Sequence, residues 1–135
     1  MKKGSAELVV KYWLDISKED LIAAEAMLKA HRYTWCAFIC QQALEKCLKA
    51  GYVKMKKTIP PYIHKLERLC QVLKIELPWE ILKEIIKIDK YYIVARYPAY
   101  KKMVNISNYK IAKKIFQDTK EIYKWLLKEL KLQKL

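Results

Sequence analysis

Glycine is almost absent from this chain, with two among 135 residues, and there are only four prolines. Hairpins and tight turns depend on these residue types, so their scarcity argues against a β-rich fold. No apolar run reaches the roughly 20 residues that a membrane-spanning helix needs, so we expect no membrane contact. We also expect no signal peptide, because residues 1–5 lead directly into an amphipathic segment. These absences predict a helical protein of the cytoplasm.

Cysteine pairs with the spacing of a zinc or redox motif are also missing. The four cysteines are Cys36, Cys40, Cys47 and Cys70, and the chain has only two histidines to complement them. Structural zinc sites need four ligands and usually contain closely spaced cysteine pairs. We therefore expect no metal site and no cofactor. Free cysteines of this kind are typical of small core residues in a reducing compartment.

Acidic residues are few, since 14 Asp and Glu stand against 28 Lys and Arg, which gives a formal net charge of +14. Heat-adapted proteins gain lysine together with glutamate to build ion-pair networks, and glutamate is not enriched here. A positive field of this size concentrates polyanions near the surface. Contact with nucleic acid or nucleotide is one interpretation. General solubility combined with growth at high temperature is the alternative.

Apolar residues recur with the helical period along almost the whole chain. The proline pair at 60–61 and Pro98 each end a helix, because proline cannot continue a helix interior, and Asn108 is placed to cap the last one. Residues 99–107 are expected to form an exposed connector. With no linker or repeat, residues 1–135 are expected to form a single domain, an all-α, four-to-five-helix up-and-down bundle. The expected helices span residues 6–30, 34–56, 62–74, 77–96 and 108–131.

One expected helix carries polar groups beside core positions. The run QQALEKCLKA begins at Gln41, and Gln42, Glu45/Lys46 and Lys49 fall on one line of the helix. A glutamine amide both donates and accepts hydrogen bonds, and lysines are compact charges suited to phosphate. The alternative is that Glu45 pairs with Lys49 one turn later, while Gln41 and Gln42 face water or a partner subunit.

Two further polar sites follow. His64 comes after the proline turn and is expected in the first turn of the third helix, where it could cap, accept a hydrogen bond or transfer protons near neutral pH. Arg96 and Tyr97 end the fourth helix. A guanidinium group can bind phosphate and a tyrosine face can stack a base, although arginine is also favoured at a helix end by the dipole alone. The other histidine, His31, is expected at the surface or as a cap.

Together these motifs resemble HEPN domains (higher eukaryotes and prokaryotes nucleotide-binding). The run from Gln41 to Ala50 resembles the family signature, and the resemblance extends to His64-Lys65-Leu66 and to Arg96-Tyr97-Pro98. It covers nearly the whole chain, from about Trp13 to Leu130. The resemblance implies a small helical bundle, usually a homodimer, often encoded beside a minimal nucleotidyltransferase and associated with toxin–antitoxin or other defence systems.

The family's ribonucleases pair an arginine with a histidine that follows it at a short spacing. From Arg96, that histidine would stand at Lys101, Lys102 or Met103, and none of these is a histidine. We therefore expect no catalytic residue of that type, and the leading interpretation is a nucleotide- or RNA-binding module that partners a nucleotidyltransferase. The candidate phosphate-binding residues are Gln42, Lys46, Lys49, His64, Arg96 and Tyr97.

Two alternatives remain open. One is a ribonuclease toxin with a degenerate site, in which His64 substitutes for the missing histidine beside Arg96. The other is a purely structural dimer that binds only protein, in which the polar line of the second helix ties helices or subunits together.

Overall fold

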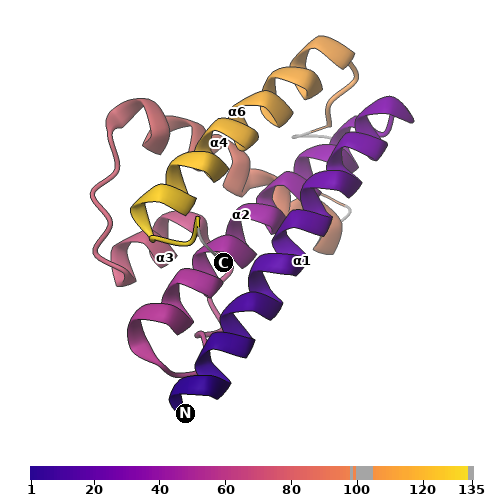
Figure 1. The fold of residues 1–135 in the computed structure, drawn as a ribbon. Coiled ribbons are helices and arrows are strands. Elements are labelled where there is room, and N and C mark those ends of the chain that lie inside the picture. The colour runs from indigo at the N-terminus through magenta and orange to yellow at the C-terminus, as the bar shows by residue number, and fades with distance from the viewer. Residues whose placement is uncertain (98, 100–104, 134–135) are drawn as a thin grey trace.

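Five helices account for most of the residues that the structure describes (Figure 1). The structure, a computed structural model, describes residues 1–97, 99 and 105–133, apart from the side chains of residues 3 and 94–96. No strand occurs among these residues, so the expected all-α fold is confirmed. The helices are α1 (Lys3–Lys29), α2 (Tyr33–Lys56), α3 (Leu66–Val72), α4 (Trp79–Arg96) and α6 (Tyr109–Glu129).

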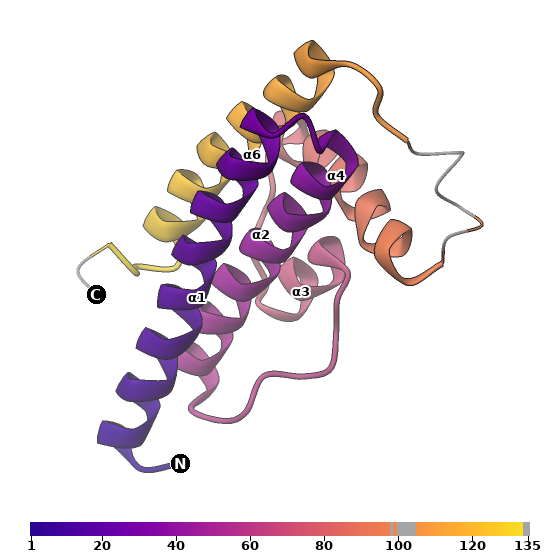
Figure 2. The ribbon, with the colours of Figure 1, turned by 90° about the vertical axis from the view of Figure 1, so that its right-hand side faces the viewer.

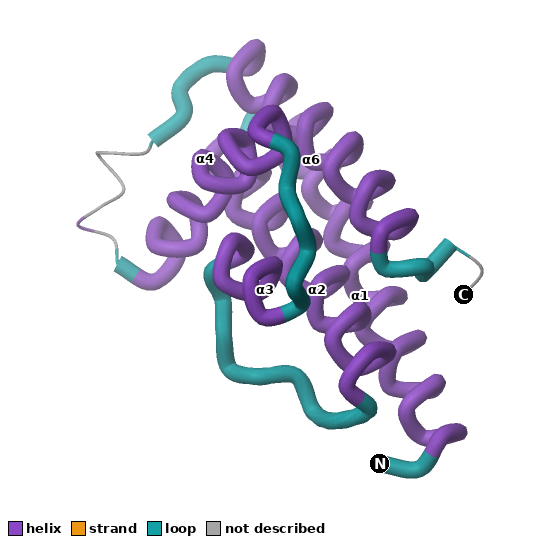
Figure 3. The backbone as a smooth tube through the Cα atoms, turned by 90° about the vertical axis from the view of Figure 1, so that its left-hand side faces the viewer, coloured by secondary structure: helices purple, strands orange, loops and turns teal. Residues whose placement is uncertain are grey.

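The central element is α2, which packs against each of the other four helices. It runs antiparallel to α1 after a short turn, and α6 packs along both of them (Figure 1). On the other side of α2 lie α3 and α4 (Figure 2). The segments before and after α3 have no regular structure of their own (Figure 3). Because α2 is surrounded, most of its side chains are buried, polar ones included.

The hydrophobic core forms two clusters. The larger takes residues from all five helices, and the smaller joins α1, α2 and α6 through residues such as Leu28, Cys40 and Phe116. All four cysteines are buried and unpaired by disulfides, as expected of core residues. Burial raises the pKa of the Cys70 thiol to about 12, which keeps it in the neutral thiol form. Among the described residues, no helix is both long and apolar enough to cross a membrane.

Most helix boundaries agree with the sequence pattern. As expected, α1 is one unbroken helix, and Asn108 caps α6, since its Oδ1 accepts from the backbone N–H of Lys110 at 2.7 Å. The third helix is shorter than expected, because it begins only at Leu66, and His64 therefore precedes it. The reason lies in α4, where Asp89 accepts from the N–H of Leu66 at 2.8 Å and so supplies the acceptor at which the helix starts.

The connector before α6 is only partly as expected. Pro98 and residues 100–104 lie outside the described residues, whereas Asn105 and Ser107 are exposed. Ile106, however, is buried, because it packs in the smaller cluster and its N–H donates to Thr34 Oγ1 at 3.0 Å. The expectation of an exposed segment is therefore wrong at this residue.

Candidate functional site

A line of buried polar residues runs along α2. Gln41, Glu45 and Lys49 stand one helical turn apart and are exposed by only 0%, 4% and 6%. Gln42 and Lys46 lie beside this line and are partly buried. The expectation that Gln41 faces water or a partner is wrong, because α3 and α4 cover that side of α2.

These side chains form one hydrogen-bonded network. Glu45 accepts from Lys49 Nζ at 3.0 Å, which confirms the pair considered for this spacing. It also lies 3.2 Å from His64 Nδ1 and accepts from Gln41 Nε2 at 3.5 Å. Gln41 donates to the carbonyl oxygen of His64 at 2.8 Å, and Gln42 donates to Gln41 at 2.8 Å. The Glu45 carboxylate thus has three nitrogen neighbours, from Gln41, Lys49 and His64, and the network holds both the backbone and the ring of His64.

Burial explains why every member of the network has a partner. An isolated charge inside a protein is very unfavourable, so a buried lysine and a buried glutamate need each other. The Lys49 ammonium also lies 5.7 Å from the centre of the Trp13 ring, close enough for a cation–π contact. Among the described residues that are not exposed, no buried side-chain nitrogen or oxygen lacks a hydrogen-bond partner. Lys49 therefore lies inside the bundle.

Lys46 has a different neighbour. Its Nζ lies 2.7 Å from Asp20 Oδ2, and the two side chains are 22% and 19% exposed. The pair joins α1 to α2. Of the candidate residues, the network brings together Gln42, Lys49 and His64, through Gln41 and Glu45, whereas Lys46 is tied to α1.

His64 borders a pocket on the α4 side of the bundle. Its ring stacks on Tyr92 with the ring centres 4.6 Å apart and the planes inclined by 16°. The pocket measures about 520 Å³, and we call it the His64 pocket. Its lining consists of His64, Lys65, Ile86, Asp89, Lys90, Tyr92 and Ile93. Two lysines, one aspartate, a pair of stacked rings and two isoleucines thus surround one cavity.

Asp89 connects this pocket to the backbone of α3. Its two carboxylate oxygens accept from the N–H groups of Leu66 at 2.8 Å and Glu67 at 3.3 Å. Burial raises the pKa of the Asp89 carboxyl above its usual value, while these two hydrogen bonds and one from Gln41 oppose the rise. Asp89 is therefore a partly buried cap for α3 that also lines the pocket.

The last two candidates lie at the end of α4. Arg96 is its final residue, with a side chain outside the described part, and Tyr97 follows with 57% of its surface exposed. Lys101, Lys102 and Met103 lie outside the described residues.

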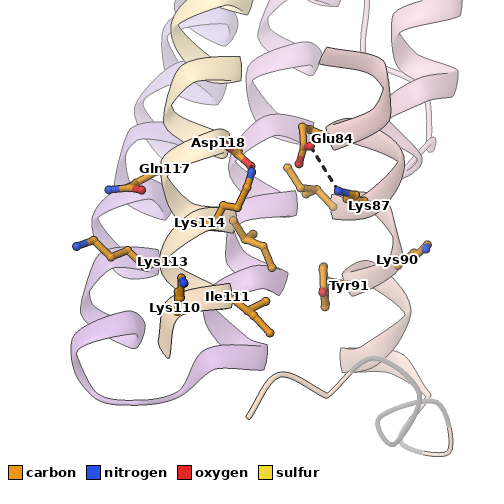
Figure 4. A pocket seen from close by; sticks show the side chains of 12 residues that line it. Glu84, Lys87, Lys90, Tyr91, Lys110, Ile111, Lys113, Lys114, Gln117 and Asp118 are labelled. Atoms are coloured by element: carbon orange, nitrogen blue, oxygen red, sulfur yellow. Dashed lines mark hydrogen bonds and ion pairs between the residues drawn. The ribbon is translucent and has the colours of Figure 1, made fainter. Parts of the chain in front are cut away.

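A second basic cavity was missed by the sequence analysis. Between α4 and α6 lies a pocket of about 610 Å³, whose lining includes five lysines (Figure 4). They are Lys87, Lys90, Lys110, Lys113 and Lys114. The two lysines of α4 are three residues apart, and those of α6 are three and four residues apart, so the sequence alone places each set on one face of its helix. Nothing in the sequence indicates that these faces of α4 and α6 lie opposite each other across one cavity.

The geometry of the His64 pocket suits binding rather than a metal centre. Its volume lies in the range of small-molecule sites, and its mixture of apolar walls with a few polar groups is typical of them. Within the described part of the chain, no three His, Cys, Asp or Glu residues are grouped so that they could hold a metal ion. A ligand with a flat ring and an anionic group would find partners for both.

Comparison with known proteins identifies a family and a solved structure with a similar fold. A model of the HEPN domain matches residues 10–130. The crystal structure of TT1696 from Thermus thermophilus has a TM-score of 0.72 at 22% sequence identity, over 88% of this chain and 96% of that one. No curated protein matches. The structural similarity shows a shared fold, and the family match covers most of the chain. The chain therefore belongs to the HEPN domain family, which at the level of the family consists of nucleotide- or RNA-binding modules.

Proposed function

We propose that this protein binds RNA or a nucleotide in the His64 pocket. The observation that carries the proposal is the stacked pair of His64 and Tyr92 at a cavity that Lys65 and Lys90 also line. A ring face offers a base a stacking surface, which contributes about 1–3 kcal/mol per base. Lysine ammonium groups neutralise phosphate and release counterions. The net charge of +14 favours the same class of ligand.

Arg96 and Tyr97 extend this site along α4. Arg96 stands six residues beyond Lys90, which is about 9 Å along the helix axis. Successive phosphates on one strand are several ångströms apart. If one phosphate binds at Lys90, the next phosphates of the strand would therefore lie near the end of α4. Gln42 and Lys49 then act indirectly, since they belong to the network that holds His64 in place.

We further propose a homodimer that partners a minimal nucleotidyltransferase in a toxin–antitoxin or other defence system of the cytoplasm. These assignments follow from the family resemblance, and four buried cysteines without disulfides agree with a reducing compartment. Light scattering after gel filtration measures the mass of the particle. A particle of one chain's mass at micromolar concentration would contradict the dimer.

The binding proposal is tested with fluorescently labelled hexauridylate and with labelled AMP. Reversing both pocket lysines, Lys65→Glu with Lys90→Glu, should weaken binding by at least about tenfold and reduce its dependence on salt. The matched control reverses Lys18 and Lys56, which are exposed and do not line the pocket, so it has the same net charge. Equal losses in both double variants would mean that only net charge matters, and the pocket assignment would be wrong.

One observation favours a second candidate function, RNA cleavage by a degenerate site. The Glu45 carboxylate lies beside Nδ1 of His64, which is the arrangement that orients an imidazole for proton transfer. If this function is present, the purified protein shortens hexauridylate and His64→Gln removes the cleavage. Intact hexauridylate after prolonged incubation at pH 7 would eliminate this candidate, while binding measured on the same sample keeps the first proposal testable.

A further inference from the structure

The cavity between α4 and α6 differs in character from the His64 pocket. Its lining contains three isoleucines, of which Ile88 is buried and Ile111 is 52% exposed. Ile111 of α6 and Tyr91 of α4 lie on opposite sides of it (Figure 4). An exposed isoleucine beside other aliphatic side chains is an apolar surface whose burial by a partner would be favourable.

The cavity is the first half of a longer groove. A second pocket of about 490 Å³ shares Glu84 and Asp118 with the first and continues between α4 and α6 to Trp125. We call the two together the α4–α6 groove. Along α6 the lining runs from Lys110 to Lys128, which is about 27 Å of helix. This length suits a helical segment of about 18 residues better than a small molecule.

The charges around the groove indicate which kind of partner would bind there. The first pocket has five lysines against two carboxylates, and both carboxylates are already paired: Glu84 with Lys87 at 3.5 Å and Asp118 with Lys114 at 2.6 Å. The second pocket adds Lys124 and Lys128 but also Glu80 and Glu121, so the excess of positive charge lies in the first pocket. It favours acidic residues on the part of the occupant that fills that pocket. A second copy of a chain with net charge +14 is disfavoured by the same argument.

A nucleic acid strand fits the groove less well. Single strands bind where aromatic rings stack successive bases, and the first pocket contains one aromatic residue, Tyr91, among isoleucines. The carboxylates of the second pocket, Glu80, Glu84, Asp118 and Glu121, would also face phosphates, which recur at every nucleotide, whereas a helix can place uncharged residues at that end. We infer that the α4–α6 groove is the docking site for an acidic amphipathic helix of a partner protein, which lays its apolar stripe on Ile111 and places carboxylates near the lysines.

The test uses two synthetic peptides of about 18 residues with the same composition of leucine, alanine and glutamate. In one, leucines recur with the helical period, and in the other the order is scrambled. Binding to the full chain is followed by fluorescence anisotropy, with labelled hexauridylate as a third probe. The periodic peptide should bind saturably and at least about tenfold more tightly than the scrambled one.

Three variants locate the site. Ile111→Glu should weaken binding of the periodic peptide by at least about tenfold, and Lys110→Glu with Lys113→Glu by a similar factor, whereas Lys18→Glu should change it less than about twofold. Circular dichroism verifies folding, which the exposure of Ile111 leads us to expect. None of these residues lines the His64 pocket, so binding there should survive.

Equal affinity for the two peptides, or full affinity in the Ile111→Glu variant, would overturn the inference. Binding of RNA in place of the peptide would overturn it as well. If hexauridylate loses its binding in the Lys110/Lys113 variant while the periodic peptide fails to bind, the groove is a nucleic-acid site.

Discussion

At the scale of single residues, the charge arrangement around Glu45 explains the polar signature of α2. Glu45 and Lys49 are almost completely buried, and their ion pair is what makes burial of either one tolerable. The spacing of four residues made this pair predictable from the sequence. The contact of Gln41 with His64 was not predictable, because it joins residues 23 apart and depends on how the segment before α3 folds back on α2.

The ion pair gives a stability prediction. Glu45→Ala should lower the free energy of unfolding by about 3–5 kcal/mol, because it leaves the Lys49 ammonium buried without its partner. Adding Lys49→Met should recover most of that loss, since an apolar side chain of similar length needs no partner. Urea unfolding of the two variants and the wild type measures both effects. A double variant as unstable as the single one would show that the buried charge is not the cause.

Tyr123 gives a prediction for alkaline pH. Burial raises its pKa from 10.0 to about 12, although a hydrogen bond with Ser17 at 2.7 Å opposes the rise. A raised pKa means that the folded state keeps the proton longer than the unfolded state. The associated stability is fully present below pH 10 and is lost as pH rises toward about 12.

Unfolding free energies of the wild type should therefore fall more steeply between these pH values than those of Tyr123→Phe, which has no hydroxyl to ionise. Tyr62→Phe is the control, because Tyr62 is 97% exposed. Parallel pH profiles for the wild type and Tyr123→Phe would contradict the prediction.

At the scale of elements, the sequence identified the long helices and misjudged the short one. The helical period of apolar residues was sufficient for α1, α2, α4 and α6, because each buries one or more faces over several turns. The start of α3 could not be read locally, because the capping carboxylate belongs to Asp89, more than 20 residues further along the chain. The same distance hid the His64 pocket, whose walls come from the segment before α3 and from α4.

The capping role of Asp89 is testable. Asp89→Ala leaves the N–H groups of Leu66 and Glu67 without their acceptor and should lower stability by about 1–3 kcal/mol. Asp89→Asn keeps one acceptor oxygen, so its stability should lie between those of the alanine variant and the wild type. Thermal unfolding of all three proteins gives the order, and an asparagine variant less stable than the alanine variant would contradict the capping role.

The ends of the helices offer a way to stabilise the protein. His31, Lys57, Lys74 and Lys131 have φ values of 55–60°, a left-handed conformation in which glycine is the favoured residue. Lys57→Gly should therefore raise stability by about 0.5–1 kcal/mol. Lys18→Gly, in the middle of α1, should instead lower it by about 1 kcal/mol. The comparison is made by urea unfolding, and a loss of stability in the Lys57 variant would contradict the argument.

At the scale of the whole molecule, α4 separates two basic surfaces that share Lys90. The His64 pocket lies on one side and the α4–α6 groove on the other. The net charge of +14 indicated a polyanionic partner, but its location came from tertiary structure. The sequence pointed to lysines on α2, whereas the structure holds Lys46 and Lys49 in ion pairs within the bundle and leaves the lysines of α4 and α6 around the cavities.

The proposal that RNA binds in the His64 pocket is tested most directly by NMR titration of the ¹⁵N-labelled protein with hexauridylate. We predict saturable shifts of the backbone amides of residues 64–65 and 86–93, with smaller changes along α1. In the Lys65/Lys90 double variant these shifts should need at least about tenfold more RNA. Shifts confined to other helices, or the absence of any shift at millimolar RNA, would contradict the proposal.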